Sequence, residues 1–242
     1  MGRVVAIVQA RMGSTRLPGK MLEDLCGHPV LDWALTRTRR SSRLEAVILA
    51  TSRATQDDPL AALAGQLGIP CHRGSEDDVL ARYVDAAHIH DADVVVRVCA
   101  DNPLVAPEEL DRLIDFHEAC IANGASPKRL YTCNGTPFAG NGYPDGLGGE
   151  TFSTALLETL HRDTCDRADR EHINRYILSH PQQFDIRTPA APPEISFPHI
   201  KLDIDTPFDL KCMRALCRRL SFDSSAVDIV EAYRSLSGDS RS

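Results

Sequence analysis

The first twenty residues constrain this chain most, because an apolar run leads directly into a basic loop that contains glycine. Residues 4–8 are apolar and mostly β-branched, which is typical of a strand buried on both faces of a sheet. The loop after them carries three cations and two glycines: Arg11, Arg16, Lys20, Gly13 and Gly19. Glycine lets a backbone approach a ligand closely, while N–H groups and fixed cations bind phosphate oxygens. The pattern predicts a strand followed by a polyphosphate-binding loop.

The charge of the chain is distributed unevenly, and the basic excess coincides with this loop. The formal net charge is −7, which argues against broad nucleic-acid binding. Residues 1–40 hold seven Lys or Arg against three Asp or Glu, whereas the remainder holds 20 against 31. A chain of 242 residues with 43% apolar and 25% charged residues has an ordinary globular composition and can bury a large core. We expect one domain over residues 1–236 and a disordered tail at 237–242.

The cysteines and the apolar runs suggest where the protein works. None of the eight cysteines forms a CxxC pair. Cys71 and Cys99 fall in or beside apolar runs, where a free thiol behaves as a small hydrophobe. Reduced thiols of this kind predict a cytoplasmic protein. No apolar run approaches the roughly 20 residues of a membrane span, and the short first run leads into charge, unlike a signal peptide. We expect no membrane partner.

Strand and helix patterns alternate through the first half of the chain. Strands are expected at residues 4–8, 46–50, 69–72 and 93–99. Helices are expected at about 29–40, 57–67, 75–90 and 107–123. Such alternation with short connections predicts an α/β fold with a parallel sheet and helices on both faces. Ligands of such sheets bind beyond the carboxyl ends of the strands.

The second half is less regular. Residues 134–150 are rich in glycine and are expected to form a loop or flap. The remaining elements are expected as helices at 153–161 and 168–180, strands at 184–188 and 199–204 around a proline-rich connection, and helices at 206–220 and 224–236.

Carboxylates at two predicted strand ends are candidate metal ligands. Asp101 directly follows the fourth apolar run, and Mg²⁺ is commonly held by one or two carboxylates together with phosphate oxygens. Asp203 and Asp205 share a face if their segment is a strand, so either could complete a site with Asp101. The alternatives are that Asp101 caps a turn and that Asp205 caps the helix that follows it.

Several better-known motifs are absent or incomplete. Gly13 and Gly19 enclose five residues and Met21 follows Lys20, so the loop is not a Walker A motif, and a surface loop with scattered charge stays an alternative. His88 and His90 lack a partner at zinc spacing. No G-x-S-x-G sequence supports hydrolase chemistry.

Six motifs, in order over about residues 3–210, together resemble one family. They are Gln9–Lys20, Arg73–Leu80, Ala100–Leu104, Tyr143–Leu147, Arg170–His172 and Asp203–Pro207. These motifs resemble the cytidylyltransferases that make CMP-activated acidic sugars. The most similar subgroup is the spore coat polysaccharide biosynthesis type, which is related to CMP-ketodeoxyoctonate and CMP-sialic acid synthetases.

The resemblance implies a fold and a set of site residues. The fold would be Rossmann-like, of the nucleotidyltransferase type, with a mostly parallel central sheet and a small dimerisation and acceptor sub-lobe. Residues 1–133 would form the nucleotide-binding half, 134–200 the flap and sub-lobe, and 201–236 the metal-binding strand end and last helices. The implied nucleotide-binding residues are Ala10, Arg11, Gly13, Ser14, Arg16, Lys20, Arg73 and Asp101. Of the site residues, the catalytic ones would be Arg11, Lys20, Asp101 and Asp205, with Asp101 and Asp205 binding Mg²⁺.

The acceptor side departs from the subgroup pattern. The implied acceptor-binding residues are Asp145, Glu150, Arg170 and His172. The subgroup commonly has a sequence such as G-L-D-V-E after its Pro-Asp-Gly, whereas this chain has Gly148 where the carboxylate is expected. This departure leaves the acceptor open.

The resemblance implies a Mg²⁺-dependent cytidylyltransferase of nucleotide-sugar or polysaccharide biosynthesis. It would transfer CMP from CTP to an acidic sugar or a small phosphorylated acceptor and release pyrophosphate. The expected partners are CTP, an anionic small-molecule acceptor and a second copy in a homodimer, with no nucleic acid. Two alternatives stay open, namely transfer from another nucleoside triphosphate to a sugar 1-phosphate, and a non-catalytic nucleotide-binding module.

Overall fold

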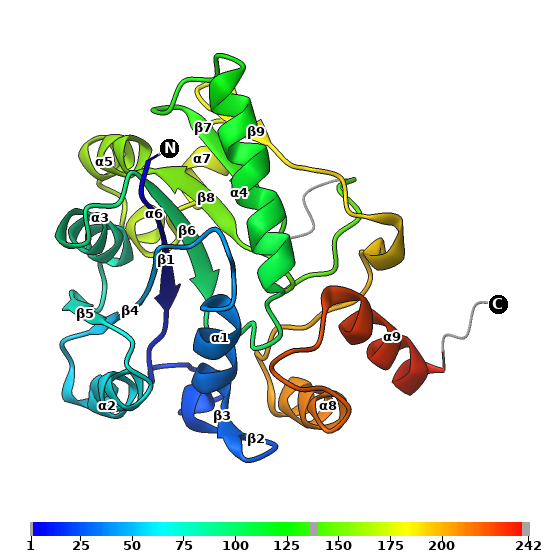
Figure 1. The fold of residues 1–242 in the computed structure, drawn as a ribbon. Helices are drawn as coiled ribbons and strands as arrows, with labels where there is room; N and C mark the ends of the chain where they lie inside the picture. Colours follow the sequence, from blue (N-terminus) through cyan, green and yellow to red (C-terminus); the bar gives the residue numbers. More distant parts are fainter. Residues whose placement is uncertain (1, 136–139, 239–242) are drawn as a thin grey trace.

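A seven-stranded sheet forms the centre of the protein in a computed structural model that describes residues 2–135 and 140–238 (Figure 1). In spatial order the strands are β5 (Cys71–Gly74), β4 (Ala46–Ser52), β1 (Val4–Gln9), β6 (Val94–Cys99), β8 (Glu150–Ser153), β7 (Leu130–Cys133) and β9 (Asp185–Arg187). The first four run parallel, β8 is antiparallel to both of its neighbours, and β9 is parallel to β7. The predicted α/β class with a mostly parallel sheet is confirmed.

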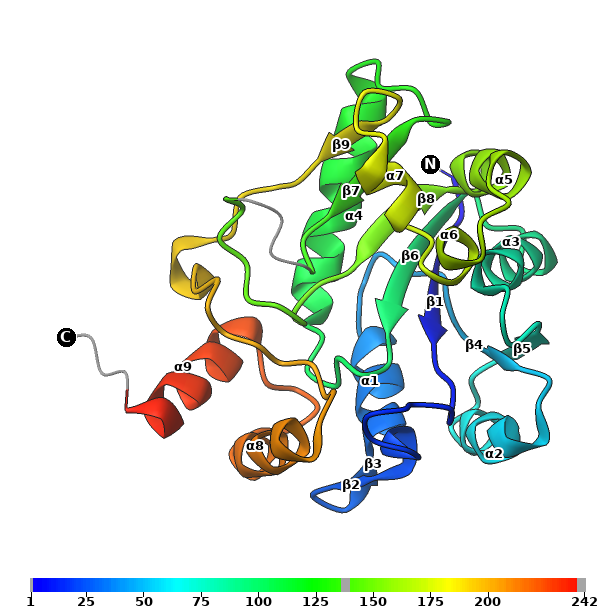
Figure 2. The same cartoon turned by 180° about the vertical axis from the view of Figure 1, so that it is seen from behind.

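Alternation along β1 divides the core between the two faces of the sheet. Val5 and Ile7 pack on one face and Val4, Ala6 and Val8 on the other, because successive side chains of a strand point in opposite directions. The first face is covered by α3 (Val79–Ile89), α5 (Thr154–Asp163) and α7 (Arg175–Ser179), which lie in front in Figure 2. The second is covered by α1 (Val30–Thr38), α2 (Asp58–Gln66) and α4 (Pro107–Ala122).

The C-terminal helices form a smaller lobe beside α1, around a third apolar cluster (Figure 1). The lobe consists of α8 (Pro207–Cys217), α9 (Ala226–Ser237) and the short hairpin of β2 (Asp24–Leu25) with β3 (His28–Pro29). Leu202 and Ile204 are fully buried in this cluster, so the lobe packs directly against the segment that carries the predicted metal ligands.

Two expectations for the second half of the chain are wrong, and two of its strands were not expected. The sequence did not indicate the four-residue strands β7 and β8, and β8 begins at Glu150, inside the predicted flap. Residues 199–204 form no regular strand and make only an isolated bridge between Lys201 and Asp145, because their neighbours are loops. The helix predicted at 168–180 is broken into α6 (Arg167–Glu171) and α7, since the backbone of His172 leaves the helical region.

The remaining short elements and the chain end complete the description. The 3-10 turns are η1 (Lys20–Leu22), η2 (Thr55–Asp57) and η3 (Pro193–Ile195). Helix α9 includes Ser237, the first residue of the predicted tail, and residues 239–242 lie outside the described part of the chain, as do 136–139 of the predicted flap. Within the described ranges, no helix is long and apolar enough to cross a membrane.

Arg37 of α1 ties the helical lobe to the rest of the protein. Its guanidinium is fully buried and donates hydrogen bonds to the carbonyls of Val105 (2.8 Å), Phe222 (3.0 Å) and Ser224 (2.9 Å). Burial lowers the pKa of Arg37 to about 10, so the group stays charged at neutral pH. These bonds join α1 to the segment before α4 and to the loop between α8 and α9.

Replacing Arg37 by Met should destabilise the protein by about 2–4 kcal/mol, because several backbone carbonyls lose their donor at once. Equilibrium urea unfolding would measure this loss. Arg39→Met is the matched control, since Arg39 is exposed and donates a hydrogen bond to the Leu67 carbonyl at 2.9 Å. This variant should cost about 0.5 kcal/mol or less. Equal costs for the two variants would contradict the role given to Arg37.

Candidate active site

The loop after β1 is closed by its own backbone and held by a carboxylate from the neighbouring strand connection. Gly19 adopts φ 74°, the left-handed conformation that favours glycine, and its N–H donates to the Met12 carbonyl. The N–H of Met12 donates to Oδ1 of Asp57 at 2.8 Å. Asp57 is fully buried and also accepts from Ser52 at the end of β4. The loop is therefore fixed at the carboxyl end of the sheet.

Lys20 lies at the centre of the site. Its ammonium donates to Oδ2 of Asp101 at 2.9 Å, to the Ile204 carbonyl at 2.7 Å and to Oδ1 of Asp205 at 3.3 Å. Lys20 is only 7% exposed, so its charge is stabilised by these partners instead of by water. Arg16 pairs with the other oxygen of Asp205 at 2.8 Å. Four predicted residues that are far apart in the sequence thus meet at one point.

Capping of α8 decides which of the two candidate aspartates faces Lys20. The N-cap is Thr206, and Oδ2 of Asp209 accepts the N–H groups of Asp205 (3.0 Å) and Thr206 (2.8 Å). The alternative that Asp205 caps this helix is therefore wrong. Asp203 pairs with Lys201 at 3.2 Å, whereas Asp205 shares Lys20 with Asp101.

Asp145 extends this acidic group from the glycine-rich segment. Its N–H donates to the Ile200 carbonyl at 2.9 Å and its carbonyl accepts from Leu202 at 3.0 Å, so it is held against the segment that leads to Asp205. Burial, followed by the charge of Asp203, raises the pKa of Asp145 to about 6. The carboxyl group of Asp145 therefore becomes charged only as the pH approaches neutrality.

Arg11 and two acceptor candidates connect α6 to the site. Arg11 donates to Oε1 of Glu171 at 2.8 Å, which places α6 next to the basic loop. Arg170 pairs with Asp78, the N-cap of α3, at 2.6 Å, and so anchors α6 on that helix. His172 is exposed at the end of α6.

Glu150 belongs to a polar row that the sequence did not reveal. It pairs with Arg97 of β6 at 2.5 Å and accepts from Asn174 at 3.1 Å. Within the described residues, Oε2 of Glu150, Nε of Arg97 and Oε1 of Gln9 are buried without a hydrogen-bond partner. Arg97 is the single charge within the otherwise apolar run at residues 94–99, and that charge is the sequence signal for this row.

Arg73 and Ser14 are not joined to the group around Lys20 by any contact that the structure records. The guanidinium of Arg73 binds the carbonyls of Ser52 (2.8 Å) and Ala54 (2.9 Å) and the carboxylate of Asp58 (2.6 Å). The hydroxyl of Ser14 accepts the N–H of Leu17 at 3.3 Å. In this arrangement Arg73 stabilises the connection after β4.

The departure at Gly148 has a steric reason. A Cβ atom at Gly148 would lie 2.0 Å from Oδ1 of Asn134, and one at Gly149 would lie 2.8 Å from the Arg97 carbonyl. Asn134 is fully buried and accepts the N–H of Gly149 at 3.0 Å while donating to the Glu109 carbonyl. No side chain fits at position 148 beside Asn134, so close packing against the Asn134 side chain replaces the missing carboxylate.

The carboxylates of Asp101 and Asp205 both lie beside one cation, so their arrangement can be compared with a site for a divalent metal. The ammonium of Lys20 stands in for that cation between Asp101 and Asp205. Among the described residues, no cluster of three or more His, Cys, Asp or Glu could form a metal cage from protein groups alone. Mg²⁺ commonly uses one or two carboxylates and completes its shell with phosphate oxygens and water. The donor set fits that mode of binding.

Comparisons with known proteins find similar proteins over most of the chain. The family model described as cytidylyltransferase matches residues 5–229. A spore coat polysaccharide biosynthesis protein of Bacillus subtilis is 34% identical over 90% of this chain and 88% of its own length. A 3-deoxy-manno-octulosonate cytidylyltransferase of an Anaeromyxobacter species is 34% identical over 74% of each chain. The solved structure of a cytidylyltransferase from Leptospira borgpetersenii has a TM-score of 0.88 at 29% identity and covers 98% of this chain and 96% of its own.

The raised pKa of Asp145 predicts a pH-dependent stability. Because the folded state favours the protonated carboxyl, it loses stability as pH rises from the ordinary value of 3.8 through about 6. Asp145→Asn removes this titration. Its Tm should therefore exceed that of the parent protein at pH 7.5, and the difference should shrink at pH 4.5.

Thermal unfolding by circular dichroism at several pH values would measure the effect. Asp85→Asn is the matched control, because Asp85 lies on the exposed side of α3. A Tm difference for Asp145→Asn that stays constant with pH would contradict the assignment.

Proposed function

This chain belongs to the cytidylyltransferase family and is a CTP-dependent nucleotidyltransferase, and we propose that it transfers CMP from CTP to an anionic sugar or a small phosphorylated acceptor with the help of Mg²⁺. The observation that carries the proposal is the meeting of Lys20 with Asp101 and Asp205 beside the basic loop. The names of the two curated relatives support an acidic sugar and polysaccharide biosynthesis as its setting. We also propose that the protein forms a homodimer and is located in the cytoplasm.

The proposed reaction is an in-line substitution at the α-phosphorus of CTP. An acceptor oxygen forms a new bond to that phosphorus, the bond from the phosphorus to the oxygen bridging to the β-phosphate breaks, and pyrophosphate leaves. A hydroxyl acceptor passes its proton to solvent, whereas an ionised phosphate acceptor has no proton to lose. The task of the protein is to position the reactants and to neutralise charge. Arg16 and Lys20 would contact the β and γ phosphates, and Arg11 would contact the phosphate near the reacting centre.

Asp101 and Asp205 would hold Mg²⁺, which when bound neutralises charge on the phosphate oxygens. Lys20 satisfies both carboxylates when no metal competes, so the two side chains stay in place before loading. Arg16 is 64% exposed at its side chain and so has room to reach a ligand. Its partner Asp205 is kept in place through the backbone bond to Asp209.

The acceptor would lie on the other side of the reacting centre. Asp145 and Glu150 would line this side from the glycine-rich segment and β8. The buried, unpartnered atoms of Glu150 and Arg97 would supply an acceptor and a donor for sugar hydroxyls. Arg170 would act by holding α6, because its guanidinium is occupied by Asp78. His172 is exposed next to Ile173 and would contact the acceptor from α6.

Pyrophosphate release tests the reaction and the nucleotide. With Mg²⁺ and a panel of acidic sugars, phosphorylated and phosphonate acceptors, CTP should support release while UTP, GTP and ATP should not. Lys20→Ala and Asp101→Asn should each lower the rate by about 10²–10³-fold, because each removes charge stabilisation at the reacting phosphates.

Lys211→Ala is the control, since Lys211 is exposed on α8. It should leave the rate unchanged, and circular dichroism should show that all variants are folded. Near-normal turnover by either site variant would overturn the role given to that residue, and release with another nucleotide but not with CTP would overturn the proposal.

Competition between Lys20 and the metal gives a test without turnover. Lys20→Met removes the resident cation and leaves two carboxylates that repel each other, so the nucleotide-free variant should bind Mn²⁺ about tenfold more tightly than the parent protein. Electron paramagnetic resonance of free Mn²⁺ would measure the affinity. Lys211→Met should bind as the parent does, and an unchanged affinity of Lys20→Met would show that the metal does not share this site.

A further inference from the structure

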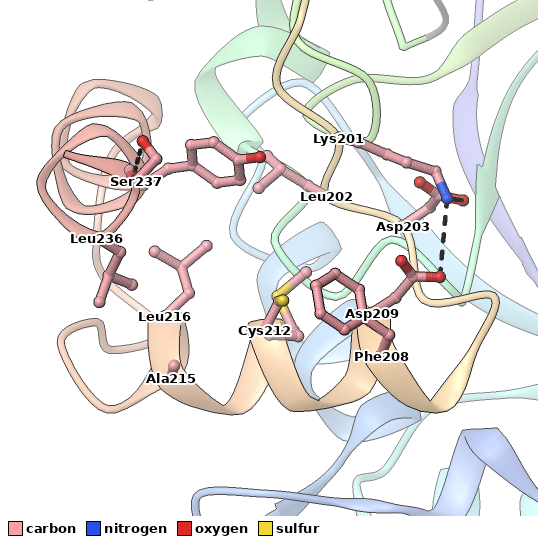
Figure 3. Close-up of a pocket in the computed structure, with 12 residues that line it drawn as sticks. Lys201, Leu202, Asp203, Phe208, Asp209, Cys212, Ala215, Leu216, Leu236 and Ser237 are labelled. Atoms are coloured by element: carbon pink, nitrogen blue, oxygen red, sulfur yellow. Dashed lines mark hydrogen bonds and ion pairs between the residues drawn. The ribbon is translucent and has the colours of Figure 1, made fainter. Parts of the chain in front are cut away.

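A groove between the two C-terminal helices is not used by the proposed reaction. It has a volume of about 440 Å³ and lies between α8 and α9, against residues 201–203 (Figure 3). Volumes of roughly 300–1,000 Å³ are usual for small-molecule sites. The groove is therefore large enough for a compact organic ligand.

The walls of the groove are apolar and partly unprotected from water. Its main apolar side chains are Leu202, Phe208, Met213, Leu216, Tyr233 and Leu236. Phe208 is 71% exposed and Leu236 is 42% exposed. Figure 3 shows Leu216 of α8 opposite Leu236 of α9, with Cys212 further along α8. An apolar body placed there would remove this surface from water and gain free energy by doing so.

One end of the groove is charged, with an excess of carboxylates. Lys201 lies 3.2 Å from Oδ2 of Asp203 and 3.7 Å from Oδ2 of Asp209. Within the described part of the chain, Oδ1 of Asp203 has no hydrogen-bond partner. Rotation about the terminal torsion, which is broad for aspartate, can present either oxygen to a neighbour. One ammonium therefore faces two carboxylates. Asp209 also accepts the N–H groups of Asp205 and Thr206, so a second cation would pair with Asp203.

We propose that this groove binds a small amphiphilic amine, with its aliphatic or aromatic body between α8 and α9 and its ammonium beside Asp203. The apolar walls select the body, and the excess negative charge at one end selects the cationic head. A neutral head gains less at that end, and an anionic head is repelled by Asp203 and Asp209.

The unmodified protein tests the head-group preference. Isothermal titration calorimetry with 2-phenylethylamine, 2-phenylethanol and 3-phenylpropanoate compares a cationic, a neutral and an anionic head on similar bodies. The amine should bind about tenfold more tightly than the alcohol, and the carboxylate should bind most weakly. Equal affinities, tighter binding of the carboxylate, or no binding of any of the three would overturn the proposal.

Two variants locate the site. Asp203→Asn should weaken the amine about tenfold and leave the alcohol unchanged, because only the charge of the head is affected. Cys212→Phe should abolish binding of both by filling the groove. Asp85→Asn and Cys165→Phe make the same substitutions at exposed positions away from the groove and should bind as the parent protein does. Undiminished amine binding by Cys212→Phe would place the amine elsewhere.

If a variant fails to fold, alkylation of Cys212 in the unmodified protein still tests whether the amine binds in the groove. Cys212 is exposed and lines the groove, and Cys165 is an exposed internal reference. The amine should slow modification of Cys212 by iodoacetamide and leave Cys165 unchanged, as measured by peptide mass spectrometry. If protection of Cys212 increases with protein concentration and not with amine concentration, a second copy of the chain covers the groove. That result would overturn the proposal.

Discussion

The buried ammonium of Lys20 is the interaction on which the arrangement of the site depends. Burying an unpaired charge is costly, so Lys20 requires Asp101, Asp205 and the Ile204 carbonyl at the positions they occupy. These partners come from the turn after β6 and from the segment before α8. One side chain therefore joins the first strand, a central strand and the C-terminal lobe.

The same contact explains how an irregular segment can hold the carboxylate of Asp205 in a fixed position. Residues 199–204 have no strand beside them, yet they are fixed by Lys20, by the backbone bonds to Asp145 and Asp101, and by burial of Leu202 and Ile204. The capping box of α8 then sets the direction of Asp205. Precise placement thus results from several weak restraints that act on a short segment.

The proposed acceptor side is shaped by close packing in the middle of the sheet. Asn134 occupies the space that a side chain at Gly148 would need, and β8 brings Glu150 opposite Arg97. The result is a buried pair with unused hydrogen-bonding atoms, instead of the carboxylate expected two residues earlier. Buried polar atoms of this kind are costly unless a ligand or water satisfies them, which agrees with an acceptor site.

The sequence alone determined the strand and helix alternation of the first half, the family, and the residues of the basic loop. These features are local: a β-branched run, a glycine that needs φ of 74°, and cations at fixed spacing. The sequence also indicated Asp101 and Asp205 as candidates, because a carboxylate after a buried strand lies at the edge where ligands bind.

Only the tertiary structure decided which of these residues meet. Lys20 pairs with Asp205 and not with Asp203, and Arg97 pairs with Glu150. Arg73 binds the connection after β4, and Asn134 leaves no room for a side chain at Gly148. Each of these contacts joins segments that are distant in the chain. Strands β7 and β8 form for the same reason, since four residues carry little propensity of their own and are stabilised by neighbouring strands. Long-range pairing depends on packing and burial, which local sequence patterns do not contain.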